Sequence, residues 1–145
     1  MSRINHYPIN IAKQVEAALL EDLGGEISVQ NDITAMLIDA DATMSAKIIT
    51  REHCVLCGSA WVNEVLAQIN TDIVLDWQCK DGDVLDADET IVYIQGNARA
   101  ILTAERSALN FLQTLSGTAT TTASYVKYLN NTHTQLLDTR KTLPG

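Results

Sequence analysis

The sequence predicts an α+β module over residues 1–100, followed by the opening of a second domain over residues 101–145. In the first part, segments with a helical repeat of apolar residues are interspersed with segments in which apolar and polar residues alternate. After Gly96 the pattern changes to two helical stretches and one short apolar strand. The composition, 46% hydrophobic and 19% charged over 145 residues, is typical of a chain with a globular core.

Two helices are predicted in the first part. The first follows Asn10, a good N-cap, and ends at Gly24 and Gly25. Its apolar stripe consists of Ile11, Val15, Ala18, Leu19 and Leu23. Asp32 is expected to cap a short helical turn further along. The second helix covers residues 59–70, opens at Ser59, and carries a stripe of Trp61, Val62, Val65, Leu66 and Ile69.

Strands are predicted where apolar residues alternate with polar ones, at residues 43–50 and 73–80. Residues 89–96 form a further strand that is apolar at its centre, and Asp81-Gly82 is a turn. Residues 53–58 are interpreted either as the continuation of the first strand or as its hairpin partner.

After Gly96 we predict a long helix over residues 98–117, which Gly117 breaks. Its buried stripe is expected to be Ile101, Leu102, Leu109, Leu112 and Leu115. A second helix, residues 118–131, is weakened by its threonine-rich start. Residues 135–138 then form one short apolar strand.

The net charge and the first residues of the chain limit the functional classes to which the protein is expected to belong. A net charge of -8 argues against a nucleic-acid binder, whose affinity rests on neutralising phosphates. The sequence has no apolar run long enough to span a membrane, and its first residues lack the apolar core of a signal peptide. A cytoplasmic protein is therefore expected.

Three cysteines, Cys54, Cys57 and Cys79, are expected to be reduced thiols in the core. Cys54 and Cys57 have the C-x-x-C spacing, but a zinc site would require a second such pair. The Val-Leu insert is typical of a strand rather than of a redox motif.

Two stretches carry candidate chemistry. Arg140-Lys141, the only adjacent pair of bases, follows the last predicted strand and lies beside Thr139. Loops at the carboxyl ends of strands bind ligands in α/β folds, so this loop predicts a clamp for a carboxylate, phosphate or pyrophosphate rather than a hydrophilic tail. Arg106 lies among small and apolar residues, where a solvated helix face and a functional guanidinium are equally consistent with the pattern.

Three stretches together carry a family resemblance, and they cover nearly the whole chain. They are Glu21-Asp22-Leu23-Gly24 with Asn31-Asp32-Ile33-Thr34; Glu105-Arg106-Ser107-Ala108-Leu109-Asn110-Phe111 leading to Leu115-Ser116-Gly117; and Asp138-Thr139-Arg140-Lys141-Thr142-Leu143-Pro144-Gly145. Their order and spacing resemble the N-terminal half of quinolinate phosphoribosyltransferase, the nicotinate-nucleotide pyrophosphorylase of NAD synthesis. The last motif is the most specific of the three.

The resemblance implies a hammerhead-like α+β sandwich with a role in dimerisation, followed by an incomplete α/β barrel whose first strand is residues 135–138. It implies transfer of the phosphoribosyl group of phosphoribosyl pyrophosphate, bound with Mg2+, to quinolinate, with release of pyrophosphate and CO2. It also implies a homodimer or higher assembly whose active site is shared between subunits.

By position in the motifs, the resemblance assigns catalytic roles to Arg140 and Lys141. Arg140 would hold a quinolinate carboxylate, and Lys141 would lie between quinolinate and the phosphoribosyl donor. Thr139 would help to position quinolinate. Arg106 would reach into the site of the neighbouring subunit and contribute to substrate binding there.

The chain departs from the family pattern at Asn31, where many members have glycine, and at Leu143, where many have threonine; neither change removes a charge. A complete barrel needs roughly 200 residues or more, so we expect a fragment that is inactive alone. Three alternatives stay open: a related nicotinate phosphoribosyltransferase, a carrier-like binding module suggested by residues 80–96, and a non-catalytic dimerisation module.

Overall fold

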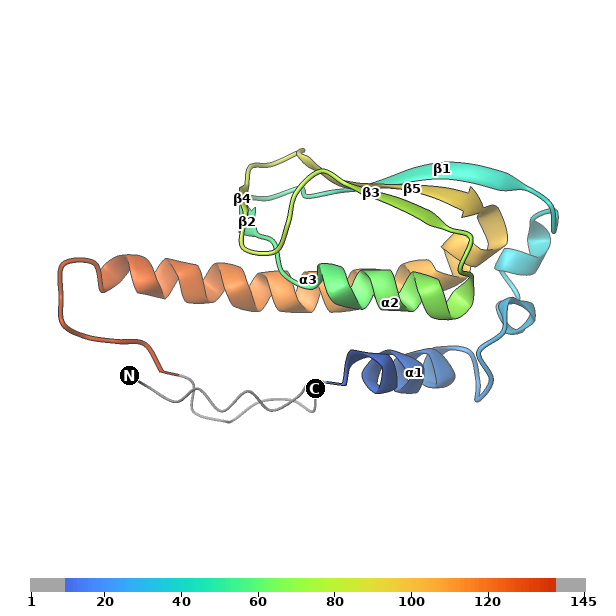
Figure 1. Ribbon diagram of the computed structural model, residues 1–145, viewed down its shortest axis with the longest axis horizontal. Helices are drawn as coiled ribbons and strands as arrows, with labels where there is room; N and C mark the ends of the chain where they lie inside the picture. The colour runs from blue at the N-terminus through green and yellow to red at the C-terminus, as the bar shows by residue number, and fades with distance from the viewer. Residues whose placement is uncertain (1–9, 138–145) are drawn as a thin grey trace.

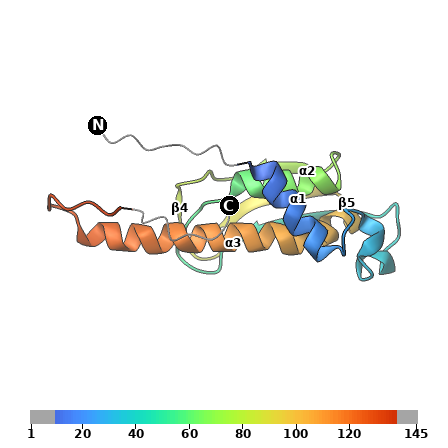
Figure 2. The same cartoon turned by 90° about the horizontal axis from the view of Figure 1, so that it is seen from below.

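The computed structural model describes residues 10–137, which form a layered α+β arrangement (Figure 1). A small antiparallel sheet lies on one side of the helices α2 (Ser59–Ile69) and α3 (Ala98–Tyr128). Helix α1 (Ile11–Asp22) lies on the other side of them, as the view from below also shows (Figure 2). The α+β class predicted for the first part of the chain is confirmed.

The sheet has three strands in the order β1 (Thr43–Ile49), β5 (Thr90–Asn97), β3 (Val74–Trp77), and all neighbours are antiparallel. The three predicted strands are thus confirmed. The ends of β1 and β5 differ by at most one residue from the prediction, whereas β3 covers only four of the eight residues predicted. The central strand β5 supplies the fully buried Val92.

Both interpretations of residues 53–58 are wrong. Strand β2 (Cys54–Val55) pairs with β4 (Val84–Leu85) in a separate two-stranded sheet. The physical reason is a turn after β1, in which the Thr50 hydroxyl donates to the Glu52 carbonyl oxygen at 2.6 Å. This turn leads the chain away from β1 and toward the segment around Val84, which lies far along the sequence.

The ends of α1 and α2 follow local chemistry. Asn10 caps α1 by accepting a hydrogen bond from the Lys13 N–H at 3.1 Å. At the other end Gly24 has φ 76°, and the Gly25 N–H donates to the Leu20 carbonyl oxygen at 2.7 Å, as in a Schellman motif. Helix α2 begins at Ser59 as predicted, but its capping carboxylate is that of Asp81.

The 3-10 turns η1 (Val29–Asn31) and η2 (Ala35–Leu37) connect α1 to the sheet. Asp32 caps the second turn, because its Oδ1 atom accepts hydrogen bonds from the N–H groups of Thr34 and Ala35 at 3.0 and 3.1 Å. The predicted capping role of Asp32 is therefore confirmed.

Helix α3 is continuous over 31 residues, so the predicted break at Gly117 is wrong. Contacts on both sides of Gly117 hold the helix in place: the Ser116 hydroxyl accepts from the Cys57 N–H at 3.0 Å, and the Thr120 hydroxyl accepts from the Val55 N–H at 2.9 Å. The hydroxyl of Thr121 donates to the Gly117 carbonyl oxygen at 2.9 Å. These bonds outweigh the weak helix propensity of the segment.

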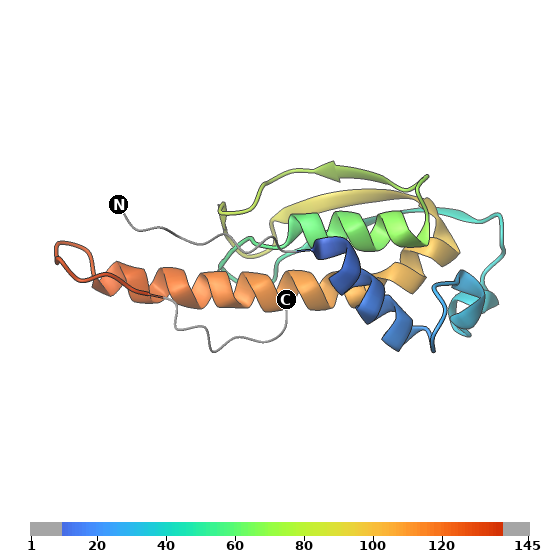
Figure 3. The ribbon, with the colours of Figure 1, turned by 60° about the horizontal axis from the view of Figure 1, so that its bottom comes forward.

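One core joins all layers. Its fully or almost fully buried members come from α1, α2, the sheet and the first half of α3, and include Val15, Leu19, Val62, Val65, Val92, Ala104 and Leu112. The division of the chain near residue 100 stays a prediction, although the first half of α3 shares this core. Figure 3 shows the second half of α3 extending beyond the sheet.

The predicted strand at residues 135–138 is not seen in its described part, because residues 135–137 are not in a strand. A strand takes its hydrogen bonds from neighbouring strands, and residues 10–137 place none beside this segment. Asp138 lies outside the described residues, and the barrel stays a prediction.

Replacing Gly117 with alanine is expected to raise the free energy of unfolding by about 0.5–1 kcal/mol, because glycine inside a helix is destabilising by that amount. An added Cβ would meet no heavy atom within 4 Å. Chemical denaturation followed by circular dichroism measures the change. The control is Gly58→Ala, which should lower stability because Gly58 has φ 116° and its added Cβ would lie 3.1 Å from Leu115 Cδ1.

The isolated 145-residue chain is expected to self-associate, because apolar side chains at the end of α3 are exposed. Tyr125, Val126 and Tyr128 all lie on the part of the helix that extends beyond the sheet. Light scattering over a range of concentrations measures the mass. Glutamate at positions 125 and 128 should reduce the association, and a monodisperse monomer of the unchanged chain would contradict the prediction.

Candidate functional site

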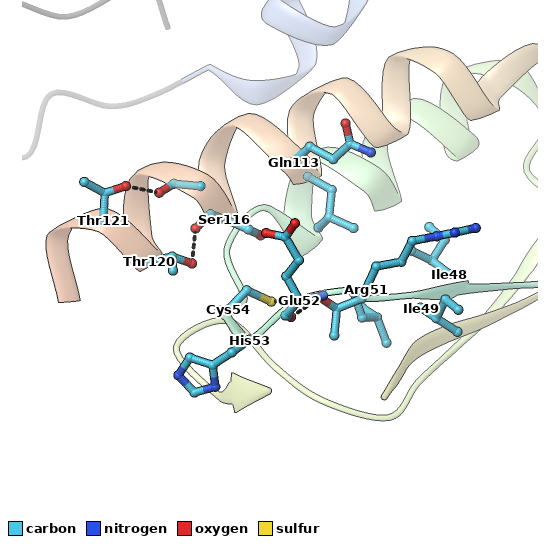
Figure 4. Close-up of a pocket in the computed structure, with 14 residues that line it drawn as sticks. Ile48, Ile49, Arg51, Glu52, His53, Cys54, Gln113, Ser116, Thr120 and Thr121 are labelled. Atoms are coloured by element: carbon cyan, nitrogen blue, oxygen red, sulfur yellow. Dashed lines mark hydrogen bonds between the residues drawn. The ribbon is translucent and has the colours of Figure 1, made fainter. Parts of the chain in front are cut away.

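Two hollows lined by residues 10–137 bear on function, and the larger of the two has a volume of about 600 Å3. It lies between the connection from β1 to β2 and the middle of α3 (Figure 4). Its charged or titratable side chains are the consecutive Arg51, Glu52, His53 and Cys54, and His53 points away from α3. The Nδ1 atom of His53 lies 3.1 Å from Asp86 Oδ1, and both side chains are exposed. The hydroxyls of Ser116 and Thr120 are bonded to the backbone of residues 55–57.

The smaller hollow, of about 170 Å3, lies between the end of α1, the two 3-10 turns and the first half of α3. We call it the Arg106 pocket. It is lined by Asp22, Leu23, Asn31, Asp32, Ile33, Leu102, Thr103 and Arg106. The pocket therefore unites two stretches that are far apart in the sequence, one acidic and one basic.

Arg106 forms an ion pair with Asp22 across this pocket. The Nη1 atom of Arg106 lies 2.6 Å from Asp22 Oδ1. The Arg106 side chain is 74% exposed, whereas that of Asp22 is only 17% exposed. The guanidinium is thus accessible to a ligand while one of its nitrogen atoms is held by a partly buried carboxylate. Glu105, the neighbour in sequence, is exposed and lies on a different face of the helix.

Asp22 is fixed by the way α1 ends. It is the last residue of the helix, and Leu19 and Leu23 on either side of it are buried in the core. The Leu23 N–H donates to the Leu19 carbonyl oxygen at 2.9 Å, and Gly24 then turns the chain away. The carboxylate of Asp22 is consequently presented to α3 from a rigid position.

Thr103 also lines this pocket. It lies one helical turn before Arg106 and is 2% exposed. Its Oγ1 atom is shielded from solvent and has no hydrogen-bond partner among the residues that the structure describes. Because a buried hydroxyl without a partner is costly, this atom lowers stability and offers no accessible contact to a ligand.

Two other polar side chains of the pocket are occupied by structural bonds. Asp32 caps the second 3-10 turn through its Oδ1 atom. The Asn31 side-chain N–H donates to the Glu26 carbonyl oxygen at 3.1 Å. The group best placed to meet an anion is therefore the guanidinium of Arg106.

Of the predicted site residues, the structure places Arg106 at an accessible pocket. Thr139, Arg140 and Lys141 lie outside the described residues. The sequence analysis missed Asp22 as the partner of Arg106 and Thr103 as a pocket residue. One signal was available for Asp22, since an acid in the last turn of a helix is electrostatically unfavourable and calls for a compensating cation.

A family model described as "Quinolinate phosphoribosyl transferase, N-terminal domain" matches residues 32–116, more than half of the chain. The chain belongs to the quinolinate phosphoribosyltransferase family. The match spans the second 3-10 turn, the sheet, α2 and the part of α3 that carries Arg106.

Individual members of this family support the same assignment. A curated relative from Bacillus subtilis, a probable nicotinate-nucleotide pyrophosphorylase, is 32% identical over 142 residues, which are 98% of this chain and 47% of the relative. The solved nicotinate-nucleotide pyrophosphorylase of Francisella tularensis is 43% identical with a TM-score of 0.88, covering 99% of this chain and 50% of that one. NadC from Streptococcus pyogenes is 35% identical with a TM-score of 0.85, covering 94% and 47%.

The chain thus spans about half the length of these family members. Within residues 10–137, no group of three or more His, Cys, Asp or Glu side chains is arranged to hold a metal ion. Nor does any helix in that range combine the length and apolar character that crossing a bilayer requires.

The three cysteines are free thiols, as predicted, but each is half-buried rather than in the core. Burial raises the pKa of the Cys57 thiol, and the nearby Asp81 carboxylate adds to this rise. Burial also raises the pKa of Cys79, with smaller contributions from Asp83 and other acidic neighbours. A raised pKa leaves less thiolate near neutral pH, so neither cysteine is suited to nucleophilic chemistry.

Alkylation of Cys57 and Cys79 by iodoacetamide is expected to be slower in the folded chain than in the urea-unfolded chain near pH 8. The pH at which each rate reaches half its maximum should also be higher when the chain is folded. Mass spectrometry of labelled peptides measures both. In Asp81→Asn, which keeps an oxygen acceptor for the α2 cap, the profile of Cys57 should shift toward lower pH. Equal folded and unfolded profiles would contradict the prediction.

Proposed function

We propose that this chain contributes the N-terminal half of a quinolinate phosphoribosyltransferase, which makes nicotinate mononucleotide for NAD synthesis. The observation that carries the proposal is the family match over residues 32–116, because it includes the helix that presents Arg106. An accessible guanidinium fits the binding of a carboxylate, and quinolinate is a dianion.

The proposed reaction has two bond exchanges. The pyridine nitrogen of quinolinate forms a bond to C1 of the ribose, and pyrophosphate leaves with the electron pair of the broken C–O bond. The bond between the ring and the adjacent carboxylate then breaks and releases CO2. The electron pair left on the ring carbon is stabilised by the neighbouring positively charged nitrogen until the carbon accepts a proton.

In the proposed enzyme, Arg140 holds a quinolinate carboxylate, Thr139 helps to orient the ring, and Lys141 lies between the two substrates. Arg106 enters the site from the neighbouring subunit. Support for a subunit contact near Arg106 comes from exposed apolar side chains: Ile33, which lines the pocket, is 84% exposed, and Leu37 in the 3-10 turn that follows is 85% exposed.

The finer structural expectations belong to the same proposal. They are a hammerhead-like sandwich, an α/β barrel that follows it, and a cytoplasmic homodimer. Mg2+ would be bound with phosphoribosyl pyrophosphate.

The activity is tested with a chimera in which residues 1–145 replace the matching half of the Bacillus subtilis relative. Incubated with quinolinate, phosphoribosyl pyrophosphate and Mg2+, the chimera is expected to release CO2 and pyrophosphate in equal amounts. Nicotinate as the alternative acceptor should give no product. Turnover of nicotinate alone would favour the related nicotinate phosphoribosyltransferase.

A folded, dimeric chimera without turnover would contradict the proposed activity and favour a dimerisation module. If the two halves do not assemble, the half of the Francisella tularensis protein replaces the first partner, since that protein is 43% identical in the matched region. Circular dichroism and light scattering establish folding and mass in each case.

The shared site is tested by mixing two inactive variants, Arg106→Ala and Lys141→Ala. In a dimer whose Arg106 serves the partner's site, each hybrid contains one site with both native residues. After unfolding and refolding the mixture, we expect about a quarter of the activity of the parent chimera at the same total concentration, since about half of the dimers are hybrids with one intact site of two. No recovery would contradict the contribution of Arg106 across the interface.

A further inference from the structure

Asp22 occupies a position where a carboxylate is unfavourable for two reasons. It is the last residue of α1, where the backbone carbonyl groups already carry partial negative charge. It also lies against the Arg106 guanidinium, which is proposed to bind a dianionic substrate, and a carboxylate repels such a substrate. Within residues 10–137, the ion pair with the Arg106 guanidinium compensates for the unfavourable charge of Asp22.

We propose that Asp22 is a positioning residue that presets Arg106 for quinolinate. This inference rests on the proposed function, because it gives Asp22 a role in binding that substrate. Asp22 itself does not touch the substrate. It holds Nη1 of Arg106, and the remaining N–H groups of the guanidinium stay available for a carboxylate of quinolinate.

The geometry suits this role because the two partners differ in exposure. Asp22 is mostly buried and is fixed between Leu19 and Leu23, whereas Arg106 is mostly exposed on a long side chain. An arginine has five N–H donors, and its side chain loses rotational freedom about several bonds when it is held in one conformation. An arginine ordered before the substrate arrives loses less entropy on binding, which strengthens binding without a new contact.

A positioning role for Asp22 and a purely repulsive effect of its charge predict opposite changes in the KM for quinolinate. Without a positioning role, Asp22→Asn removes a repulsive charge and should lower the KM for quinolinate. With a positioning role, the same substitution frees Arg106 and should raise that KM by about three- to tenfold, the range expected for ordering one long side chain.

The experiment measures kcat and KM for both substrates in the chimera described above. Asp22→Asn is expected to raise the KM for quinolinate, with little change in kcat and in the KM for phosphoribosyl pyrophosphate. Asp22→Glu, which keeps the charge, should fall between Asp22→Asn and the parent. The matched control is Glu21→Gln, which removes the same charge one residue earlier from an exposed side chain.

Calorimetry measures quinolinate affinity without turnover, and it tests whether the effect of Asp22→Asn depends on Arg106. Asp22→Asn should weaken affinity in the parent and should have no further effect in the Arg106→Ala background. An equal effect in both backgrounds, or a KM that is unchanged or lowered by Asp22→Asn, would overturn the positioning role. If Asp22→Asn does not fold, a KM for Asp22→Glu equal to that of the parent overturns it.

The two proposals fail in different ways. A folded parent chimera that neither binds nor turns over quinolinate contradicts the proposed function, and the role of Asp22 with it. An active parent whose Asp22→Asn variant is unchanged contradicts the role of Asp22 alone.

Discussion

The close packing of one face of α3 is the constraint on which the rest of the structure depends. This face consists mainly of small residues at helical spacing, Ala100, Ala104, Ser107 and Ala108, and all of them are buried. Small side chains let α3 approach α2, β5 and α1 closely, so a single helix joins every layer of the core. A larger residue at any of these positions would push the layers apart.

This packing also determines what α3 can offer to a ligand. With one face buried, the residues on the flanks of the helix are fixed relative to the end of α1. Arg106 lies on such a flank beside Asp22, whereas Arg99, two turns earlier, donates to the Ile38 carbonyl oxygen at 2.6 Å and is used to hold the turn before β1. Two arginines on one helix therefore differ in availability, because the segments that lie opposite them differ.

The sequence predicts well the features that arise from neighbouring residues. The Asn10 cap, the end of α1 at Gly24, the Asp32 cap and the alternating strands all depend on contacts within a few residues. The errors concern bonds between distant segments. The continuity of α3 depends on hydroxyls that meet residues 55–57, and β2 pairs with a strand about thirty residues away. Local patterns do not contain this information.

The candidate site shows the same difference between contacts of neighbouring residues and contacts of distant segments. The motif around Arg106 indicated a functional cation, but the sequence could not show that Asp22, 84 positions away, is its partner. An exposed guanidinium with one anchored nitrogen is only part of an anion site, since two positive groups or more are needed to neutralise a dianion. The further cations predicted by the sequence are Arg140 and Lys141. If Arg106 serves a neighbouring subunit, its exposure and the exposed Ile33 and Leu37 around it have one common cause: the surface is completed only when a second chain covers it.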